Sequence, residues 1–123
     1  MILVDTSIWI DHLRNPDEHL AALLQPGLAA THPLVILELR LGSLRNRDGF
    51  LGALVRLPRL PEMSAAEVST LIESRRLWRR GLSVIDVSLA ASVLVTPGSS
   101  LWTRNRRLKL ACEEMSIPLD ISP

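Results

Sequence analysis

Three carboxylates in this sequence stand in apolar surroundings, where an ionised group is costly. Asp5 directly follows the apolar N-terminal run, Glu38 interrupts an otherwise apolar segment, and Asp86 lies between isoleucine and valine. Burying one ionised carboxylate costs several kcal/mol, against roughly 5–15 kcal/mol for the whole stability of a domain. A bound hard cation is the simplest compensation, because Mg²⁺ and Mn²⁺ take oxygen ligands. The sequence therefore predicts that these acids meet at a metal site.

Each of the three acids also has a structural interpretation that the sequence leaves open. Asp5 suits the cap of a following helix, and Asp86 suits the first turn of its helix, where negative charge favours the helix dipole. Glu38 has Arg40 nearby as an ion-pair partner. The metal site is the more economical hypothesis, because it explains all three positions with one cause.

Length and composition indicate one globular domain spanning residues 1–123, with 47% hydrophobic and 22% charged residues. The single cysteine, Cys112, excludes an internal disulfide and fits a reducing cytoplasm, which is the expected location. The N-terminal apolar run is too short for a signal peptide. No stretch approaches the ~20 apolar residues of a membrane span, so we expect no membrane association.

The order of expected elements indicates an α/β fold with a parallel sheet covered on both faces. Strands are expected at 1–4, 28–31, 101–103 and 119–121, with at most an edge strand near 57–61. Helices are expected at 8–14, 15–25, 33–41, 47–56, 64–80, 83–95 and 106–115. In such sheets the functional crevice lies beyond the carboxyl ends of the strands. Asp5 is placed there, immediately after the first strand.

Basic residues concentrate between Arg75 and Lys109, where eight of them accompany a single acid, Asp86. They are Arg75, Arg76, Arg79, Arg80, Arg104, Arg106, Arg107 and Lys109. This asymmetry is expected for a phosphate-rich partner, although a solvated helix face explains any one of them. Arg75 and Arg79, four apart on an expected helix, would follow a phosphate backbone. Trp78 could stack an RNA base, but a core or interface position is the simpler interpretation.

Four short segments with polar residues in apolar surroundings follow one another along the chain: MILVDTSIWID at 1–11, ILEL at 36–39, GLSVID at 81–86 and LWTRN at 101–105. Together they resemble the motifs of PIN-domain nucleases, and particularly of the VapC-type toxins of bacterial toxin–antitoxin pairs. The resemblance covers nearly the whole chain, from Met1 to about Pro118. No single motif is decisive, but four in order are specific.

The resemblance implies a three-layer PIN-like fold, with a central, mainly parallel sheet of four to five short strands and about seven helices. It implies Mg²⁺- or Mn²⁺-dependent hydrolysis of RNA phosphodiester bonds, a VapB-type antitoxin as inhibitor, and a homodimer. By position, Asp5, Glu38 and Asp86 correspond to three of the family's acids and would hold the metal. The candidate substrate-binding residues are Thr6, Ser7, Thr103, Arg104, Arg75 and Arg79.

Asn105 departs from the family pattern, which usually has an acid at this position, and Arg107 stands where some members have a second one. An amide oxygen binds a cation more weakly than a carboxylate does, so we expect one well-held ion and a weak second one. Asn105 stays a candidate catalytic residue, and it also suits a helix N-cap. A catalytically weak PIN-like module that binds RNA or protein is therefore the alternative function.

Two other kinds of site fit the sequence poorly. An aspartate after the first strand also suits a haloacid-dehalogenase-like nucleophile, but that class needs a second acid where this chain has Ser7. The histidines, His12, His19 and His32, show no ligand spacing with one another or with Cys112, which disfavours zinc.

Overall fold

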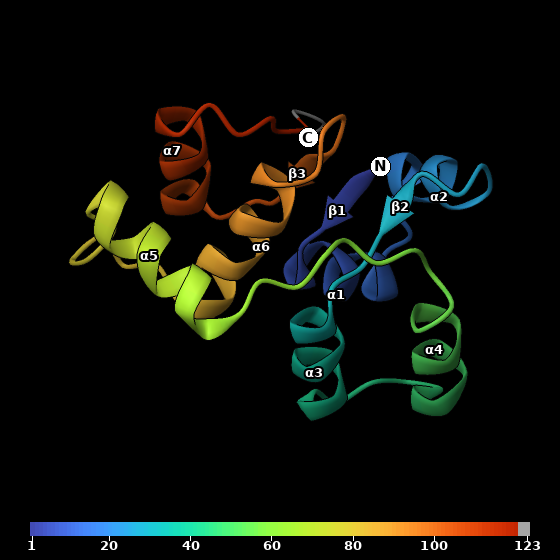
Figure 1. The fold of residues 1–123 in the computed structure, drawn as a ribbon. Helices are drawn as coiled ribbons and strands as arrows, with labels where there is room; N and C mark the ends of the chain where they lie inside the picture. The colour runs from blue at the N-terminus through green and yellow to red at the C-terminus, as the bar shows by residue number, and fades with distance from the viewer. Residues whose placement is uncertain (121–123) are drawn as a thin grey trace.

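The fold centres on a small parallel sheet flanked by helices, in a computed structural model that describes residues 1–120 (Figure 1). In this sheet β1 (Ile2–Val4) lies between β2 (Ala29–Ala30) and β3 (Ser100–Trp102), and both neighbours run parallel to it. The strands are short, apolar and almost fully buried, as expected for a parallel sheet covered on both faces. The predicted α/β class is confirmed.

The described part of the sheet has three strands, fewer than the four to five expected. At each edge the extended chain contributes only a single bridge, Thr31 with Arg59 and Leu101 with Leu119. A proline directly precedes each outer bridging residue, and because proline has no N–H to donate, the ladder does not continue. The strand expected at 119–121 is thus reduced to one bridge, and its last residue lies outside the described residues.

Seven helices lie within residues 1–120, which confirms the expected number. They are α1 (Thr6–Arg14), α2 (Glu18–Leu24), α3 (Pro33–Leu41), α4 (Arg47–Leu54), α5 (Ala65–Arg75), α6 (Val84–Leu94) and α7 (Arg106–Glu114). Two helices do not start where the sequence indicated. The first was expected to begin at residue 8, but Asp5 caps α1 through the Thr6 N–H and the helix begins at Thr6; the second was expected to begin at residue 15, but Asp17 caps α2 and the helix begins at Glu18. Both caps are aspartates, a residue type favoured at that position.

The helix predicted over 64–80 ends early, at Arg75. Arg76 adopts the left-handed conformation (φ 52°), and the Leu77 N–H bonds to a carbonyl one turn back, which closes the helix. Leu77 is 4% exposed, so its burial anchors the turn. Arg79 is also left-handed (φ 62°). Arg75 and Arg79 therefore do not share a helix face, and the prediction of a continuous helical arginine stripe is wrong.

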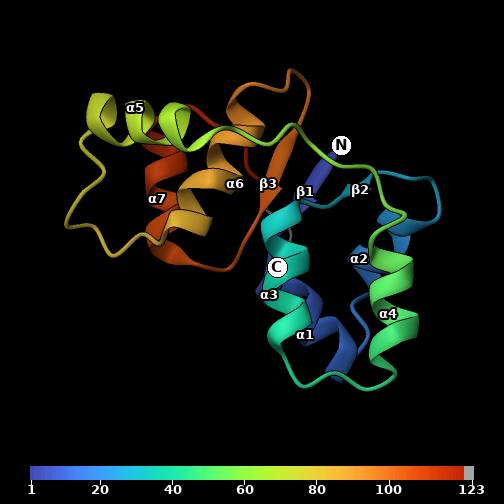
Figure 2. The same ribbon diagram turned by 60° about the horizontal axis from the view of Figure 1, so that its bottom comes forward.

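The helices form two groups around the sheet. Figures 1 and 2 show α5, α6 and α7 packed together beside β3, while α3 and α4 form a pair on the other side. Helix α6 is buried along most of its length and provides much of the core between them. Trp9, Trp102 and Cys112 are buried, whereas Trp78 is 48% exposed. Within residues 1–120, none of the helices has the length and apolar character needed to cross a membrane.

Candidate active site

Asp5 lies at the carboxyl end of β1 and is only 8% exposed. Its Oδ1 accepts a hydrogen bond from the Thr6 N–H at 2.7 Å, which caps α1. Its Oδ2 accepts from the hydroxyl of Thr103 at 2.7 Å, just after the neighbouring strand β3. The structural role considered for Asp5 is therefore real, and it leaves the carboxylate in the crevice beyond the parallel strands.

Glu38 projects from the middle of α3 toward the same region. The hydroxyl of Thr6 donates a hydrogen bond to Glu38 Oε1 at 2.6 Å. The ion pair considered between Glu38 and Arg40 does not form. Thr6 thus joins the start of α1 to α3, its N–H bonded to Asp5 and its hydroxyl bonded to Glu38.

Asp86 is the third residue of α6 and forms a capping box with Ser83. The Ser83 N–H donates to Asp86 Oδ2 at 2.9 Å, and the Asp86 N–H donates to Ser83 Oγ at 3.0 Å. Two orphan amides at the helix start are satisfied in this way. The dipole-favouring role considered for Asp86 is also real, and the cap fixes where its carboxylate lies.

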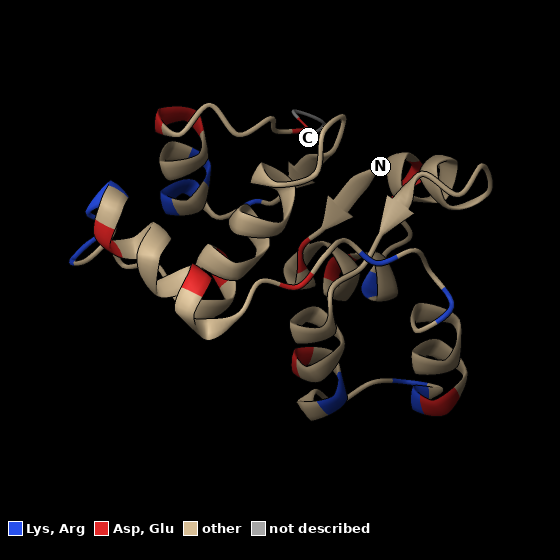
Figure 3. Cartoon of the chain, viewed as in Figure 1, with Lys and Arg blue, Asp and Glu red and all other residues tan. Residues whose placement is uncertain are grey.

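One pocket of about 460 Å³ brings the three acids together from three separate segments. Its lining residues are Asp5, Thr6, Ser7, Ile10, Glu38, Ser83, Ile85, Asp86, Arg104 and Asn105. Thr103 lies behind this lining, bonded to Asp5. Arg75 and Arg79 do not line the pocket. Figure 3 shows acidic residues where β1 passes into α1, and basic residues over α7 and the far end of α5.

The surroundings of Asp5 in this pocket disfavour its ionised form. Burial raises the pKa of Asp5, and the charges of Asp86 and Glu38 raise it further, against the opposing hydrogen bonds from Thr103 and Thr6. Within residues 1–120, no lysine or arginine forms an ion pair with any of the three carboxylates. The protein itself therefore leaves negative charge in the pocket unbalanced.

The chemistry of the lining fits a hard cation, since the candidate ligands are all oxygens and the lining contains neither His nor Cys, the preferred ligands of zinc. A ready-made cage is not present, because no group of three or more His, Cys, Asp or Glu within residues 1–120 is placed to hold a metal. Mg²⁺ commonly binds through one or two carboxylates and completes its shell with water and substrate phosphates. The pocket suits this partial kind of site.

Asn105 caps α7 rather than offering its oxygen to the pocket. Its Oδ1 accepts from the N–H groups of Arg107 at 3.0 Å and Leu108 at 3.3 Å. Its Nδ2 lies 3.4 Å from Asp86 Oδ2 and donates toward it. In this geometry Asn105 orients Asp86 and is not itself placed as a cation ligand.

Arg104 lies at the pocket with two acids that the sequence analysis did not single out. Its guanidinium bonds Asp11 Oδ2 at 2.5 Å and Asp17 Oδ2 at 3.2 Å, and lies 5.9 Å from the centre of the Trp102 ring. The Leu20 N–H, and to a smaller extent Arg104, hold the pKa of Asp17 below its usual value. No local pattern predicts these pairs, which join distant parts of the chain.

The sheet topology and the acid pocket define a known class: the PIN domain family matches residues 2–114, and the chain belongs to it. Ribonuclease VapC32 from two strains of Mycobacterium tuberculosis is 50% identical over 119 residues, covering 97% of this chain and 96% of each relative. The crystal structure of PAE2754 from Pyrobaculum aerophilum superposes with a TM-score of 0.60 at 24% identity, over 89% of this chain and 78% of that one. It supports the fold, and the predicted resemblance to VapC-type PIN proteins is confirmed.

Proposed function

We propose that this chain is a metal-dependent endoribonuclease toxin that hydrolyses RNA phosphodiester bonds. The observation that carries the proposal is the meeting of Asp5, Glu38 and Asp86 in one pocket without a basic partner among the described residues. The similarity to proteins called ribonuclease VapC32 supports RNA as the substrate. A pocket in which neighbouring acids and burial raise the pKa of one carboxyl group, here Asp5, is typical of functional sites.

Asp5, Asp86 and Glu38 would hold Mg²⁺ or Mn²⁺. When bound, such an ion polarises the phosphoryl oxygen and lowers the pKa of water. The hydroxyls of Thr103 and Thr6 keep Asp5 and Glu38 oriented. Asn105 does the same for Asp86 through its amide N–H.

Substrate contacts are assigned to groups at and around this pocket. Thr6, Ser7 and Arg104 line it and would bind the phosphate, with Thr103 behind them, bonded to Asp5. Arg75 and Arg79 lie outside the pocket, so their contacts would be with a more distant part of the RNA. Arg104 is the strongest of these candidates, because a guanidinium matches phosphate geometry.

The remaining expectations follow from membership of the family. We expect the whole chain, residues 1–123, to form a single PIN-like domain, to act in the cytoplasm and to assemble as a homodimer. We expect a VapB-type antitoxin to neutralise it. Co-expression with its neighbouring gene product tests this point: the chain alone should arrest growth, and the pair should not.

The catalytic proposal is tested by incubating purified protein with radiolabelled cellular RNA, with Mn²⁺ and with chelator. We expect cleavage that needs the metal and is lost in Asp5→Asn and Asp86→Asn. Asp48→Asn is the matched control, because Asp48 is an exposed acid on α4 that does not line the pocket. Cleavage that survives in both pocket variants would contradict the proposal.

A second function, a PIN-like module that binds RNA or protein without cleaving, is favoured by one observation. The oxygen of Asn105 is used by two backbone N–H groups, so the pocket lacks the ligand that an acid would add. If the wild-type protein cleaves no RNA and Asn105→Asp creates cleavage, this second function is the correct one.

A further inference from the structure

A second cavity adjoins the acid pocket and has a different chemistry. It measures about 520 Å³ and is lined by Ile10, Leu13, Arg14, Glu38, Leu39, Gly42, Ser43, Leu44 and Arg45. Its lining residues come from α1, from the end of α3 and from the loop after it, and Figure 2 shows α1 and α3 side by side. Ile10 and Glu38 line both cavities. The two hollows are therefore neighbours that share one wall.

Two arginines and several apolar groups give this second cavity its character. Arg14 and Arg45 are exposed, and neither forms an ion pair within residues 1–120. Leu13, which is 40% exposed, and Leu44 provide apolar wall. Unpaired guanidinium groups bind phosphate oxygens well, while apolar walls accept the flat face of a base.

We propose that this cavity is a nucleotide subsite, which holds the RNA residue next to the bond that is cut. The inference rests on the proposed function. A strand whose phosphate lies at the acids must continue to either side, and the wall formed by Ile10 and Glu38 leads directly into this hollow. Its volume lies within the roughly 300–1,000 Å³ typical of sites for small ligands.

The charge distribution favours a nucleotide over an apolar protein segment as the occupant. The most exposed apolar groups of α3 are Leu37 at 53% and Leu41 at 90%, and neither lines the cavity. A partner that sought apolar contact would cover those residues, which lie outside the cavity. Arg14 and Arg45 instead give the cavity lining two positive charges against the single negative charge of Glu38, and neither arginine is paired within residues 1–120, which suits a phosphate chain.

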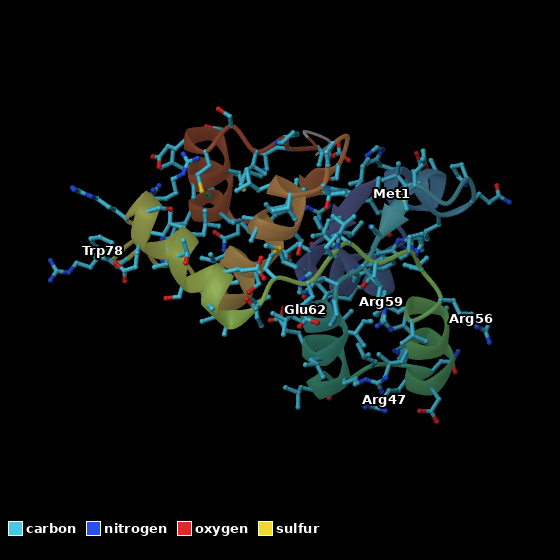
Figure 4. All side chains as sticks on the ribbon, in the orientation of Figure 1. Met1, Arg47, Arg56, Arg59, Glu62 and Trp78 are labelled. Carbon is cyan, nitrogen blue, oxygen red and sulfur yellow. The ribbon has the colours of Figure 1, made fainter. Side chains whose placement is uncertain are left out.

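The test uses a set of oligoribonucleotides lengthened one residue at a time on either side of the cleaved bond. Arg14→Ala/Arg45→Ala is compared with the wild type and with Arg56→Ala. Arg56 is exposed, unpaired and directed away from the molecule at the end of α4 (Figure 4), so it is a matched control. Circular dichroism melting checks that all three proteins fold equally well.

We expect lengthening on one side to lower KM for the wild type and the control. In the double variant this benefit should disappear, with KM raised about tenfold and kcat unchanged, because the ground-state contact is lost and the acids are untouched. The slope of log KM against log salt concentration should fall by about 0.7 for each arginine, the value for single-stranded nucleic acid.

The outcomes separate this inference from the proposed function. If the wild type cleaves RNA and the double variant keeps the same length dependence, the subsite is wrong and the nuclease proposal stands. If the variant cleaves normally but escapes inhibition by the co-encoded partner, the cavity binds protein and the inference is overturned. If the wild type cleaves nothing, the nuclease proposal fails, and fluorescence anisotropy with the same oligonucleotides decides the subsite: equal affinities would overturn it.

Discussion

Asp5 combines two roles that make opposite demands on its charge. As the N-cap of α1 it accepts a backbone N–H, which favours the ionised form. As a buried neighbour of Asp86 and Glu38, its pKa is raised above the usual value, so ionisation destabilises the folded state. The penalty is absent at pH values below the ordinary carboxyl pKa, where both states are protonated, and it is complete above the raised pKa.

Asp5→Asn should therefore stabilise the protein in metal-free buffer at pH 7, by an amount of order 1 kcal/mol. Asparagine keeps an oxygen for the Thr6 N–H but removes the charge. The gain should shrink as the pH falls and vanish below about pH 4, near the ordinary aspartate pKa. Urea unfolding across this pH range measures it. A variant that is less stable than the wild type at pH 7 would show that the cap outweighs the repulsion.

Thr103, which lies behind the pocket lining, hydrogen-bonds to the carboxyl group of Asp5 and lowers its pKa. Its hydroxyl donates to Asp5 Oδ2 and accepts from the Asn105 N–H, and the side chain is 1% exposed. Thr103→Val should cost about 1 kcal/mol, because it leaves the half-buried Asn105 N–H without its acceptor. The pKa of Asp5 should rise further, moving the acid limb of the pH–activity profile to higher pH. Thr103→Ser should restore both, and an unmoved acid limb in the valine variant would contradict the role.

At the scale of elements, the capping box of α6 decides where Asp86 points. Asp86→Ala removes both the charge and the bond to the Ser83 N–H, and should lower stability by about 1 kcal/mol. Asp86→Asn keeps an oxygen that can accept this bond, so it should lose less stability. Both should abolish RNA cleavage, since the cap alone does not make the site. Thermal melts and cleavage assays on the pair measure the two effects, and an active Asp86→Asn would show that only the cap matters.

Local chemistry explains which elements the sequence analysis predicted well. The end of α3 at Gly42 follows from the low helix propensity of glycine, and the cap of α7 at Asn105 follows from the preference of asparagine for that position. The predicted end of α5 was wrong because Arg76 is not a residue type that favours a helix end. A non-glycine residue adopts the left-handed conformation there, and the burial of Leu77 stabilises it. That cause is tertiary, so no local pattern contains it.

At the scale of the whole molecule, the site depends on elements that are far apart in sequence. The positions of Asp5 after β1 and Asp86 in the first turn of α6 were predictable, because each is set by its own element. The pairs of Arg104 with Asp11 and Asp17 were not, because they join residues 93 and 87 positions apart. The sequence indicates which groups are unusual, and the packing of the helices around the sheet decides which of them meet.

For the basic residues between Arg75 and Lys109 too, the composition shows an excess of charge, but only the packing shows which residues pair. Arg80 pairs with Glu114 at 2.5 Å, and Arg104 pairs with two acids, so part of the positive charge is used within the fold. The Arg107 side chain lies against Gly81, where an added Cβ would come within 2.4 Å of its Nη1. The arginine excess that the sequence shows is real, but two of these residues, Arg80 and Arg107, support the loop between α5 and α6, and a third, Arg104, is paired beside the acid pocket, so the group does not form one RNA track.

The most direct test of the account is a Mn²⁺ titration without RNA, by calorimetry, on the wild type, Asp5→Asn, Asp86→Asn and the control Asp48→Asn. The shared pocket predicts binding to the wild type and the control, and its loss in each pocket variant, because one ion compensates both acids. Undiminished binding in Asp5→Asn and Asp86→Asn, or no binding to the wild type, would contradict a metal held between these carboxylates.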